Sequence, residues 1–257
     1  MPRLVVALAL LAALASPPAA QAITGEQRVL VVLATWGPEP FERDAVRDIV
    51  FEQADAFLRA SSFGQLSLTG EVTPWLGAFP GRPDCATRTI ARGARDAATA
   101  AGFELGSFDR LIYLFPRNGC PFGGLGTGSE VWLNGRVFRF LVAHELGHTF
   151  GLGHASTWEC EAGSCTVEEY GSPYSMMGNG DGDFNAFEKF QLGWITNVTR
   201  VAAPGDYELG PIETPGLLPH AFVVTTARSE YWLEYRAVQV GPPLGGPSAP
   251  PGVLVHA

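Results

Sequence analysis

Short apolar runs alternate with segments of helical periodicity along the first half of the chain. The β-branched run 28–36 has no helical stripe, which predicts a buried strand. Strands are also predicted over 65–72 and 110–116. Apolar residues at steps of three and four predict a helix over 46–58, and an alanine-rich segment predicts another over 86–101. This strand–helix–strand–helix–strand order predicts parallel pairing with right-handed crossovers.

The pattern changes after residue 118. A glycine-rich loop leads into a short strand from Glu130 to Leu133. Neither Gly-Lys-Ser nor Gly-Lys-Thr follows the glycines, and the next element is a strand, so this is not a phosphate-binding loop. From Arg136 an apolar stripe predicts a helix that ends near Gly151 or Gly153, because glycine commonly follows a helix C-terminus.

The last hundred residues are richer in turns. A polar, cysteine-containing loop is predicted over 155–175, and β-type runs begin near Asn197. The Pro- and Gly-rich stretch 241–251 predicts a linker or a long loop. The final GVLVHA begins what reads as a strand and then stops, so we expect the chain to be incomplete at Ala257.

The N-terminus carries an export pattern. Arg3 precedes an apolar run over 4–15, and small residues follow as far as Ala22. This predicts a secretory signal peptide over 1–22 that is cleaved after Ala22. The run is too short to span a bilayer comfortably, and no later segment is long and apolar enough. We therefore expect no stable membrane insertion, and a mature protein that is secreted into an extracellular or periplasmic space.

The composition narrows the function further. A hydrophobic share of 46% and a charged share of 17% are typical of a folded globular protein. The formal net charge of -9 repels nucleic acid and anionic lipid, so we expect no nucleic-acid partner. The oligomeric state has no signature in the sequence, and a monomer is presumed.

Three of the five histidines lie in the run HELGHTFGLGH. His144 and His148 are four residues apart on the predicted helix, so their imidazoles lie on one face and can bind one metal ion. Glu145 is rotated by about 100° from His144, which lets it face a water molecule without being a ligand. Gly151 permits a sharp turn that brings His154 back as a third ligand.

Three protein ligands leave one coordination position open, which is typical of catalytic zinc sites. Nitrogen ligands favour zinc over calcium or magnesium. Such a site lowers the pKa of water to about 7, and Glu145 would accept a proton during attack on a carbonyl and pass it to the leaving amine. The five fixed positions should arise by chance on the order of once in a hundred thousand chains of this composition. The sequence therefore predicts one catalytic zinc ion and hydrolysis of peptide bonds.

An even number of cysteines in an exported protein favours two disulfides over metal ligation. Cys160 and Cys165 close a short loop and are the easiest pair to form, which leaves Cys85 with Cys120. The other two connectivities stay open. In a further alternative Cys85 is free and blocks the metal site, but its partner would then be left over.

The extended pattern H-E-x-x-H-x-x-G-x-x-H resembles that of the metzincin metallopeptidases. These carry a methionine turn beneath the zinc, and SPYSMMG supplies one here. The chain resembles the gametolysin-like branch, in which the methionine directly precedes a glycine; Met177 is therefore our choice, with Met176 as the alternative. Further similar segments are 62–72, 142–155, 169–178 and 184–194.

The resemblance implies an α+β fold whose first part is α/β-like. It implies a catalytic domain over 23–196, with an upper subdomain to about residue 154 and a smaller lower subdomain, and a β-rich C-terminal extension over 197–257. The upper subdomain would contain an active-site helix and a twisted, mainly parallel sheet whose antiparallel edge strand borders the cleft. An extended peptide could pair with that edge through backbone hydrogen bonds. We assign the edge strand to Glu130, Val131, Trp132 and Leu133.

Two positions depart from known patterns. Some metzincins have a tyrosine two residues after the methionine, but Asn179 stands there in this chain, which leaves Tyr170 and Tyr174 as candidate substitutes. The stretch DGDFN resembles a calcium loop, but the glycine and the glutamate that such a loop requires are missing. Calcium is therefore not expected. His220 and His256 have no ligand spacing.

The leading hypothesis is a secreted zinc-dependent endopeptidase that acts on extracellular proteins or peptides. One alternative is a non-catalytic zinc-containing module that binds a peptide or a wall polymer. The intact Glu145 argues against it, because a pure binder needs no base. A third hypothesis, an amidase acting on wall peptides, keeps the same chemistry and differs in substrate.

Overall fold

The computed structural model describes residues 22–238 and 251–257. The predicted signal peptide, apart from Ala22, and the predicted linker, apart from Pro251, lie outside the described residues. Among the described helices, none combines the length and the apolar character that a bilayer crossing requires.

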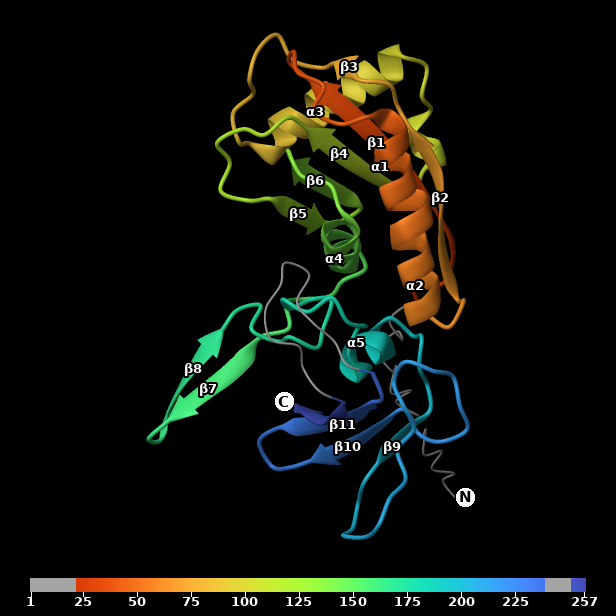
Figure 1. Cartoon of the computed structure of the whole chain (residues 1–257), viewed down its shortest axis with the longest axis vertical. Coiled ribbons are helices and arrows are strands. Elements are labelled where there is room, and N and C mark those ends of the chain that lie inside the picture. Colours follow the sequence, from red (N-terminus) through yellow and green to blue (C-terminus); the bar gives the residue numbers. More distant parts are fainter. Residues whose placement is uncertain (1–21, 239–250) are drawn as a thin grey trace, which may run out of the picture.

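A mainly parallel sheet forms the upper part of the molecule (Figure 1). Its strand order is β2-β1-β4-β6-β5, and only β5 is antiparallel to its neighbour; the two-residue strand β3 pairs with the end of β1. The predicted parallel sheet is thereby confirmed. The strands are β1 (Gly25–Thr35), β2 (Leu66–Val72), β3 (Leu76–Gly77), β4 (Arg110–Phe115), β5 (Gly124–Thr127) and β6 (Glu130–Asn134).

Helices cover both faces of this sheet, as its buried central strand requires. One face packs against a continuous helical rod over 43–61 and against the helix that contains His144 and His148, and the other packs against a single helix. Along β1, Val29, Val31 and Leu33 enter the first core, whereas Leu30 and Val32 enter the second. The helices are α1 (Arg43–Asp48), a π-helical segment (Ile49–Ala54), α2 (Asp55–Ser61), α3 (Thr87–Ala100), a 3-10 turn (Leu105–Ser107) and α4 (Arg139–Thr149).

The antiparallel edge strand is β5, and the prediction that placed it at Glu130–Leu133 is wrong. Strand β6 lies one position further in and pairs in parallel with β4. Glycine weakens a strand in isolation, which is why 124–127 reads as a loop. Here α4 packs so closely that a Cβ on Gly124 would clash with the carboxylate of Glu145, and one on Gly126 would clash with its backbone carbonyl. The glycines permit this approach of helix and strand.

Helix α4 begins three residues later than predicted. Gly135 has a left-handed backbone (φ +61°), and Phe138 is still extended before the first helical residue, Arg139. The first residues of the apolar stripe, 136–138, are therefore not helical and lead into α4. The predicted end agrees with the structure, since the helix closes at Thr149 and Gly151 follows with φ +100°.

The segment predicted as a polar loop contains a β-hairpin, β7 (Thr157–Glu161) and β8 (Ser164–Glu168), which projects from the lower part (Figure 1). The disulfide Cys160–Cys165 joins its two strands, and Cys85–Cys120 forms the second disulfide. Both favoured pairings are confirmed. Cys85 is bonded, so the alternative in which it is free to block the metal site is wrong.

A four-stranded sheet lies below the short helix α5 (Ala186–Gln191), in the order β12-β11-β10-β9. Its strands are β9 (Val198–Arg200), β10 (Ala221–Thr225), β11 (Glu230–Arg236) and β12 (Gly252–His256). A third apolar cluster joins this sheet to α5; its buried members are Ala186, Ile195, Ile212, Ala221, Val223 and Trp232. The described C-terminal residues are therefore packed against the lower part of the molecule.

Candidate active site

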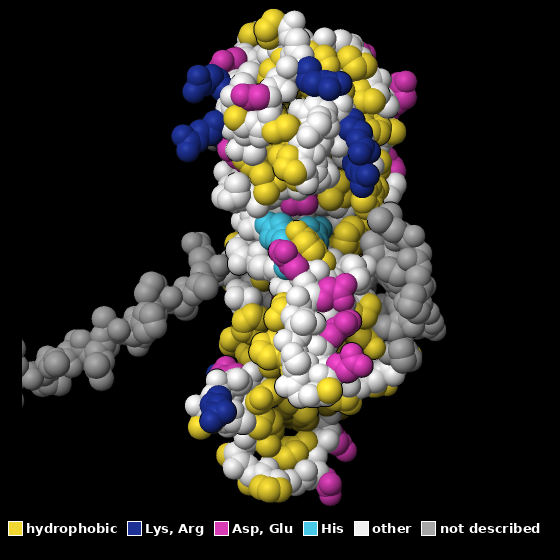
Figure 2. Space-filling model, turned by 90° about the vertical axis from the view of Figure 1, so that its left-hand side faces the viewer, with side chains coloured by type: hydrophobic (Ala, Val, Ile, Leu, Met, Phe, Trp, Pro, Cys, Tyr) yellow, Lys and Arg dark blue, Asp and Glu magenta, His cyan; other side chains and the backbone are white. Residues whose placement is uncertain are grey.

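Helix α4 and the turn after it bring three histidines together at the waist of the molecule (Figure 2, cyan). His144 and His148 project from one face of α4, one turn apart. The left-handed Gly151 reverses the chain, and His154 returns towards them. One potential ligand atom from each of the three residues lies within 4.8 Å of the others.

The three imidazoles share one protonation pattern. The Nδ1 atom of His144 lies 2.8 Å from the carbonyl oxygen of Met176, and that of His148 lies 2.9 Å from that of Leu152. The Nδ1 atom of His154 lies 2.6 Å from Oε1 of Glu169. A carbonyl or carboxylate oxygen only accepts, so each Nδ1 carries the proton and donates it. Each Nε2 is then an acceptor with a free lone pair.

These lone pairs fit a metal ion. The Nε2 atoms of His144 and His148 are 3.2 Å apart. Neither nitrogen carries a proton in this pattern, so the two lone pairs repel unless a cation lies between them. Tetrahedral zinc with Zn–N bonds of about 2.05 Å places its ligand nitrogens about 3.3 Å apart. The donor set, and the separation of these two nitrogens, therefore fit a zinc site.

Burial keeps two of these imidazoles neutral. It lowers the pKa of His144 to about 4, against the opposing effect of the hydrogen bond to Met176. It also lowers the pKa of His148 below the usual value. Metals bind the neutral ring, so protons compete weakly at these nitrogens near neutral pH.

Glu145 is buried and lines the same cleft as the three histidines. Burial raises the pKa of its carboxyl group to about 7, while a hydrogen bond from the backbone of Gly126 acts in the opposite direction. A group with a pKa near neutrality is well suited to accept and return a proton. The cleft has a volume of about 500 Å³ and lies between α4 and β5.

The two methionines of the turn have separate positions. Both are fully buried, but Met176 contributes its carbonyl oxygen to His144, whereas the sulfur of Met177 packs against Gly147 of α4. A Cβ on Gly147 would clash with that sulfur. Met177 therefore lies directly beneath the helix turn between the first two histidines.

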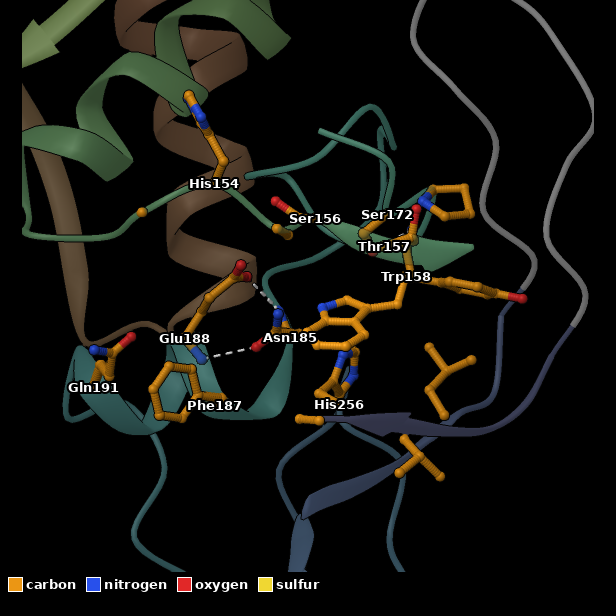
Figure 3. A pocket seen from close by; sticks show the side chains of 17 residues that line it. His154, Ser156, Thr157, Trp158, Ser172, Asn185, Phe187, Glu188, Gln191 and His256 are labelled. Carbon is orange, nitrogen blue, oxygen red and sulfur yellow. Dashed lines mark hydrogen bonds between the residues drawn. The ribbon is translucent and has the colours of Figure 1, made fainter. Parts of the chain in front are cut away.

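Only one of the two candidate tyrosines lies in this cleft. The ring of Tyr170 is centred 3.8 Å from that of His154 and 5.9 Å from that of His144. Its backbone is left-handed (φ +63°), a conformation that costs on the order of 1 kcal/mol for a residue with a side chain. Tyr174 lines a different cavity, of about 650 Å³, which lies among the segments 153–158 and 172–174, helix α5 and the C-terminal residues 254–257 (Figure 3).

The residues assigned to the edge strand lie away from the cleft. Val131 and Leu133 are in the first core. The carboxylate of Glu130 pairs with Arg95 and accepts from the hydroxyl of Tyr113. Trp132 packs on the side of α3, where its indole N–H donates to the carbonyl oxygen of Thr87. The side chains of β6 therefore alternate between the two faces of the sheet and do not face the cleft.

In the stretch 181–185, which resembles a calcium loop, the side chains of Asp181, Asp183 and Asn185 all bond to other groups of the protein. Arg139 pairs with Asp181, and Lys189 pairs with Asp183. The side chain of Asn185 caps α5 by accepting from the backbone N–H of Glu188. The two carboxylates are therefore already neutralised by cations.

Sequence reasoning missed four groups around the histidines. They are Glu169 on His154, the carbonyl oxygens of Met176 on His144 and of Leu152 on His148, and Gly147 beneath the helix. Gly147 occupies an unspecified position of the zinc pattern, so the spacing carries no signal for it. Of these groups, Glu169 was the easiest to predict from the sequence, because carboxylates commonly orient metal-binding histidines. Its separation of 15 residues from His154, however, does not reveal the contact.

We expect Gly126→Ala to destabilise the protein by about 1–3 kcal/mol, the usual range for an atom forced into a packed contact. The new Cβ would meet the carbonyl oxygen of Glu145, which belongs to the backbone of α4 and cannot rotate away. Denaturant unfolding measures the change. Gly123→Ala is the matched control, because its Cβ would meet only the Arg136 side chain, at 3.7 Å. Equal stability of the two variants would contradict the close packing of α4 on β5.

Comparison with known proteins gives one family match. The model of the family described as gametolysin peptidase M11 matches residues 58–210. A search of curated proteins finds no match. A solved chaperone–substrate complex has a TM-score of 0.39 at 14% identity, over 63% of this chain and 29% of that chain. A zinc-dependent peptidase from Methanocorpusculum labreanum has a TM-score of 0.34 at 16% identity, over 65% of this chain and 100% of that one.

The family match begins at residue 58, within α2, and ends at residue 210 in the C-terminal part. It therefore contains all three histidines, Glu145 and the methionine turn. It covers more than half of the residues in the chain. The protein therefore belongs to the gametolysin peptidase M11 family.

Proposed function

We propose that this protein is a secreted zinc endopeptidase that hydrolyses peptide bonds of extracellular proteins. One observation carries the proposal: one ring nitrogen from each of three histidines converges beside a buried glutamate in an open cleft. Membership of a peptidase family supports peptide hydrolysis. The two disulfides support an oxidising, extracytoplasmic location.

In this proposal His144, His148 and His154 hold the metal. Their Nδ1 partners fix both the tautomer and the ring orientation before the metal arrives. When bound, zinc supplies a Lewis acid for the substrate carbonyl and lowers the pKa of water to about 7. One ion at a three-histidine site with an open position is the expected stoichiometry.

Glu145 acts as the general base. Its carboxylate removes a proton from the attacking water while the water oxygen bonds to the carbonyl carbon. It then delivers that proton to the amine nitrogen as the C–N bond breaks. Burial raises the pKa of Glu145 to about 7, which makes the carboxylate a stronger base for the first step. The protonated group is still far more acidic than an ammonium ion, so the proton can pass on to the leaving amine. Tyr170 lines the same cleft, and in this proposal its hydroxyl donates a hydrogen bond to the substrate carbonyl oxygen.

The substrate lies as an extended strand along β5. Among the described residues, that strand is the outermost of the sheet and pairs only with β6. Backbone hydrogen bonds to its other side would recognise extended polypeptide with little regard for sequence. The apolar side chains of the cleft, Phe122, Leu125, Phe140 and Leu141, favour an apolar residue near the cleaved bond.

Cleavage-site profiling tests this function. The mature protein, incubated with zinc and a broad peptide library, should cut internal peptide bonds. A chelator should abolish cleavage, and added zinc should restore it. The control is the same chelator saturated with zinc beforehand, which should have no effect. Cleavage that survives metal removal would overturn the zinc mechanism, and cleavage restricted to wall peptides would favour the amidase.

A further inference from the structure

A buried chain of hydrogen bonds connects helix α5 to the methionine turn. Ser175, at the start of the turn, is fully buried. Its hydroxyl donates to the carboxylate of Glu188, with both oxygens at 2.8 Å, and accepts from the backbone N–H of Met177 at 2.9 Å. Glu188 thus fixes the conformation of Ser175–Met177 through one side-chain bridge.

The methionine turn is hydrogen-bonded at two of the three histidine positions. The carbonyl oxygen of Met176 accepts from Nδ1 of His144 at 2.8 Å. The carbonyl oxygen of Met177 accepts from the backbone N–H of Ala155, the residue after His154, at 2.9 Å. A shift of the turn would therefore change the orientation of His144 and the backbone position beside His154. The third histidine, His148, is held independently by Leu152.

Glu188 is itself held in place. Its carboxylate accepts from the backbone N–H of Asn185 at 2.7 Å, and its own N–H donates to the Asn185 side chain at 2.8 Å (Figure 3, dashed lines). Burial raises its pKa to about 7, and the hydrogen bonds from Asn185 and Ser175 oppose this rise. Hydrogen bonds therefore fix the position of the carboxyl group, which forms no ion pair with another residue that the structure describes.

The C-terminal sheet supports the same segment of chain. Glu234 on β11 accepts from the backbone N–H of Ala186, and Arg236 donates to the carbonyl oxygen of Phe184 at 3.2 Å. Both side chains are fully buried and pair with each other at 2.6 Å. The N-terminus of α5, which carries the Asn185 cap, is thereby attached to residues that lie outside the family match.

We propose that Glu188 is a positioning residue for the metal site, and that it acts through Ser175 on the turn that orients His144. The inference rests on the proposed function, because it assumes that the three histidines bind zinc. Groups one step beyond the ligands fix ligand orientation, and their loss usually lowers metal affinity about 10- to 100-fold. A role in stability alone would lower the unfolding free energy without this loss of affinity in the folded protein.

The test is zinc affinity, measured by competition with a chromophoric chelator at fixed pH. Glu188→Ala and Ser175→Ala should each weaken zinc binding by about tenfold, the low end of that range, because both act through the turn and not directly on His144. Glu188→Gln should bind nearly as tightly as wild type, because its amide can still accept from Asn185 and hydrogen-bond to Ser175. Co²⁺-loaded Glu188→Ala should also show altered ligand-field absorption bands, which report the geometry around the metal.

Thr73→Val is the matched control for stability. Thr73 is fully buried, and its hydroxyl accepts from Leu33 N–H at 3.0 Å and donates to the carbonyl oxygen of Pro74 at 2.8 Å, within the upper part. This variant should lose stability but keep wild-type zinc affinity and Co²⁺ bands. Equal losses of affinity in Thr73→Val and Glu188→Ala, or wild-type affinity in the latter, would overturn the proposal.

Three further outcomes are distinguishable from these. If Glu188→Ala does not fold, Ser175→Ala decides, because it removes only one hydroxyl group. If the wild-type protein binds no zinc, the proposed function fails and the positioning role fails with it. If wild type binds zinc and Ser175→Ala binds it equally well, only the positioning role is overturned.

Discussion

Glu145→Gln is expected to bind zinc as wild type does and to cleave peptides at least about a hundredfold more slowly, the low end for loss of a general base. The amide has the shape of the carboxylate, but it cannot accept a proton from water or return one to the leaving amine. The histidines keep their Nδ1 partners in this variant, because none of those partners is Glu145. The measurement pairs zinc content with initial rates on casein and on a short peptide.

Glu130→Gln is the matched control for that experiment. It makes the same chemical change at a carboxylate that bonds to Arg95 and Tyr113 rather than lining the cleft. Its rate should equal that of wild type. A Glu145→Gln enzyme that is as fast as wild type would contradict the general-base role. If wild type and variant bind peptides but are equally inert on a broad library, the binding-module hypothesis gains support instead.

The sequence predicted the elements whose pattern is local. The run at 28–36 has no helical period, and β1 is accordingly buried on both faces. The histidine spacing places His144 and His148 on one face of any α-helix, whatever surrounds it. Strand β5 has no such local signal. Its glycines weaken an isolated strand. Their structural role becomes apparent only in the folded protein, where they let α4 pack closely against Gly124 and Gly126.

The groups that orient the histidines were largely invisible in the sequence. Two of the three Nδ1 partners are backbone carbonyl oxygens, of Met176 and Leu152, and every residue type has such an oxygen. Their placement depends on how the chain folds back after the helix. Glu188 illustrates the same limit, since its spacing from Asn185 reveals a helix cap but not the bond to Ser175. Tertiary contacts thus determine which groups orient the histidines.

His144→Ala is expected to weaken zinc binding by more than about a hundredfold, beyond the range for loss of an orienting partner alone. The variant loses one of three nitrogen ligands and also leaves the carbonyl oxygen of Met176 without its donor, a buried defect that costs about 1–3 kcal/mol. Peptide cleavage should fall to the level of chelator-treated wild type. Elemental analysis after dialysis and chelator competition measure the metal, and initial rates measure the activity.

The control for this variant is His220→Ala, which removes a histidine outside the cluster. The ring of His220 stacks on Phe63 at 5.4 Å, and its Nε2 lies 3.0 Å from the carbonyl oxygen of Thr214. The control should keep one zinc ion per chain, because His220 belongs to the packing of the lower part and not to the ligand set. A His144→Ala protein that still holds zinc as tightly as wild type would show that the metal lies elsewhere. Equal loss of zinc in both variants would instead point to general destabilisation, since only one of the two rings faces the shared Nε2 site.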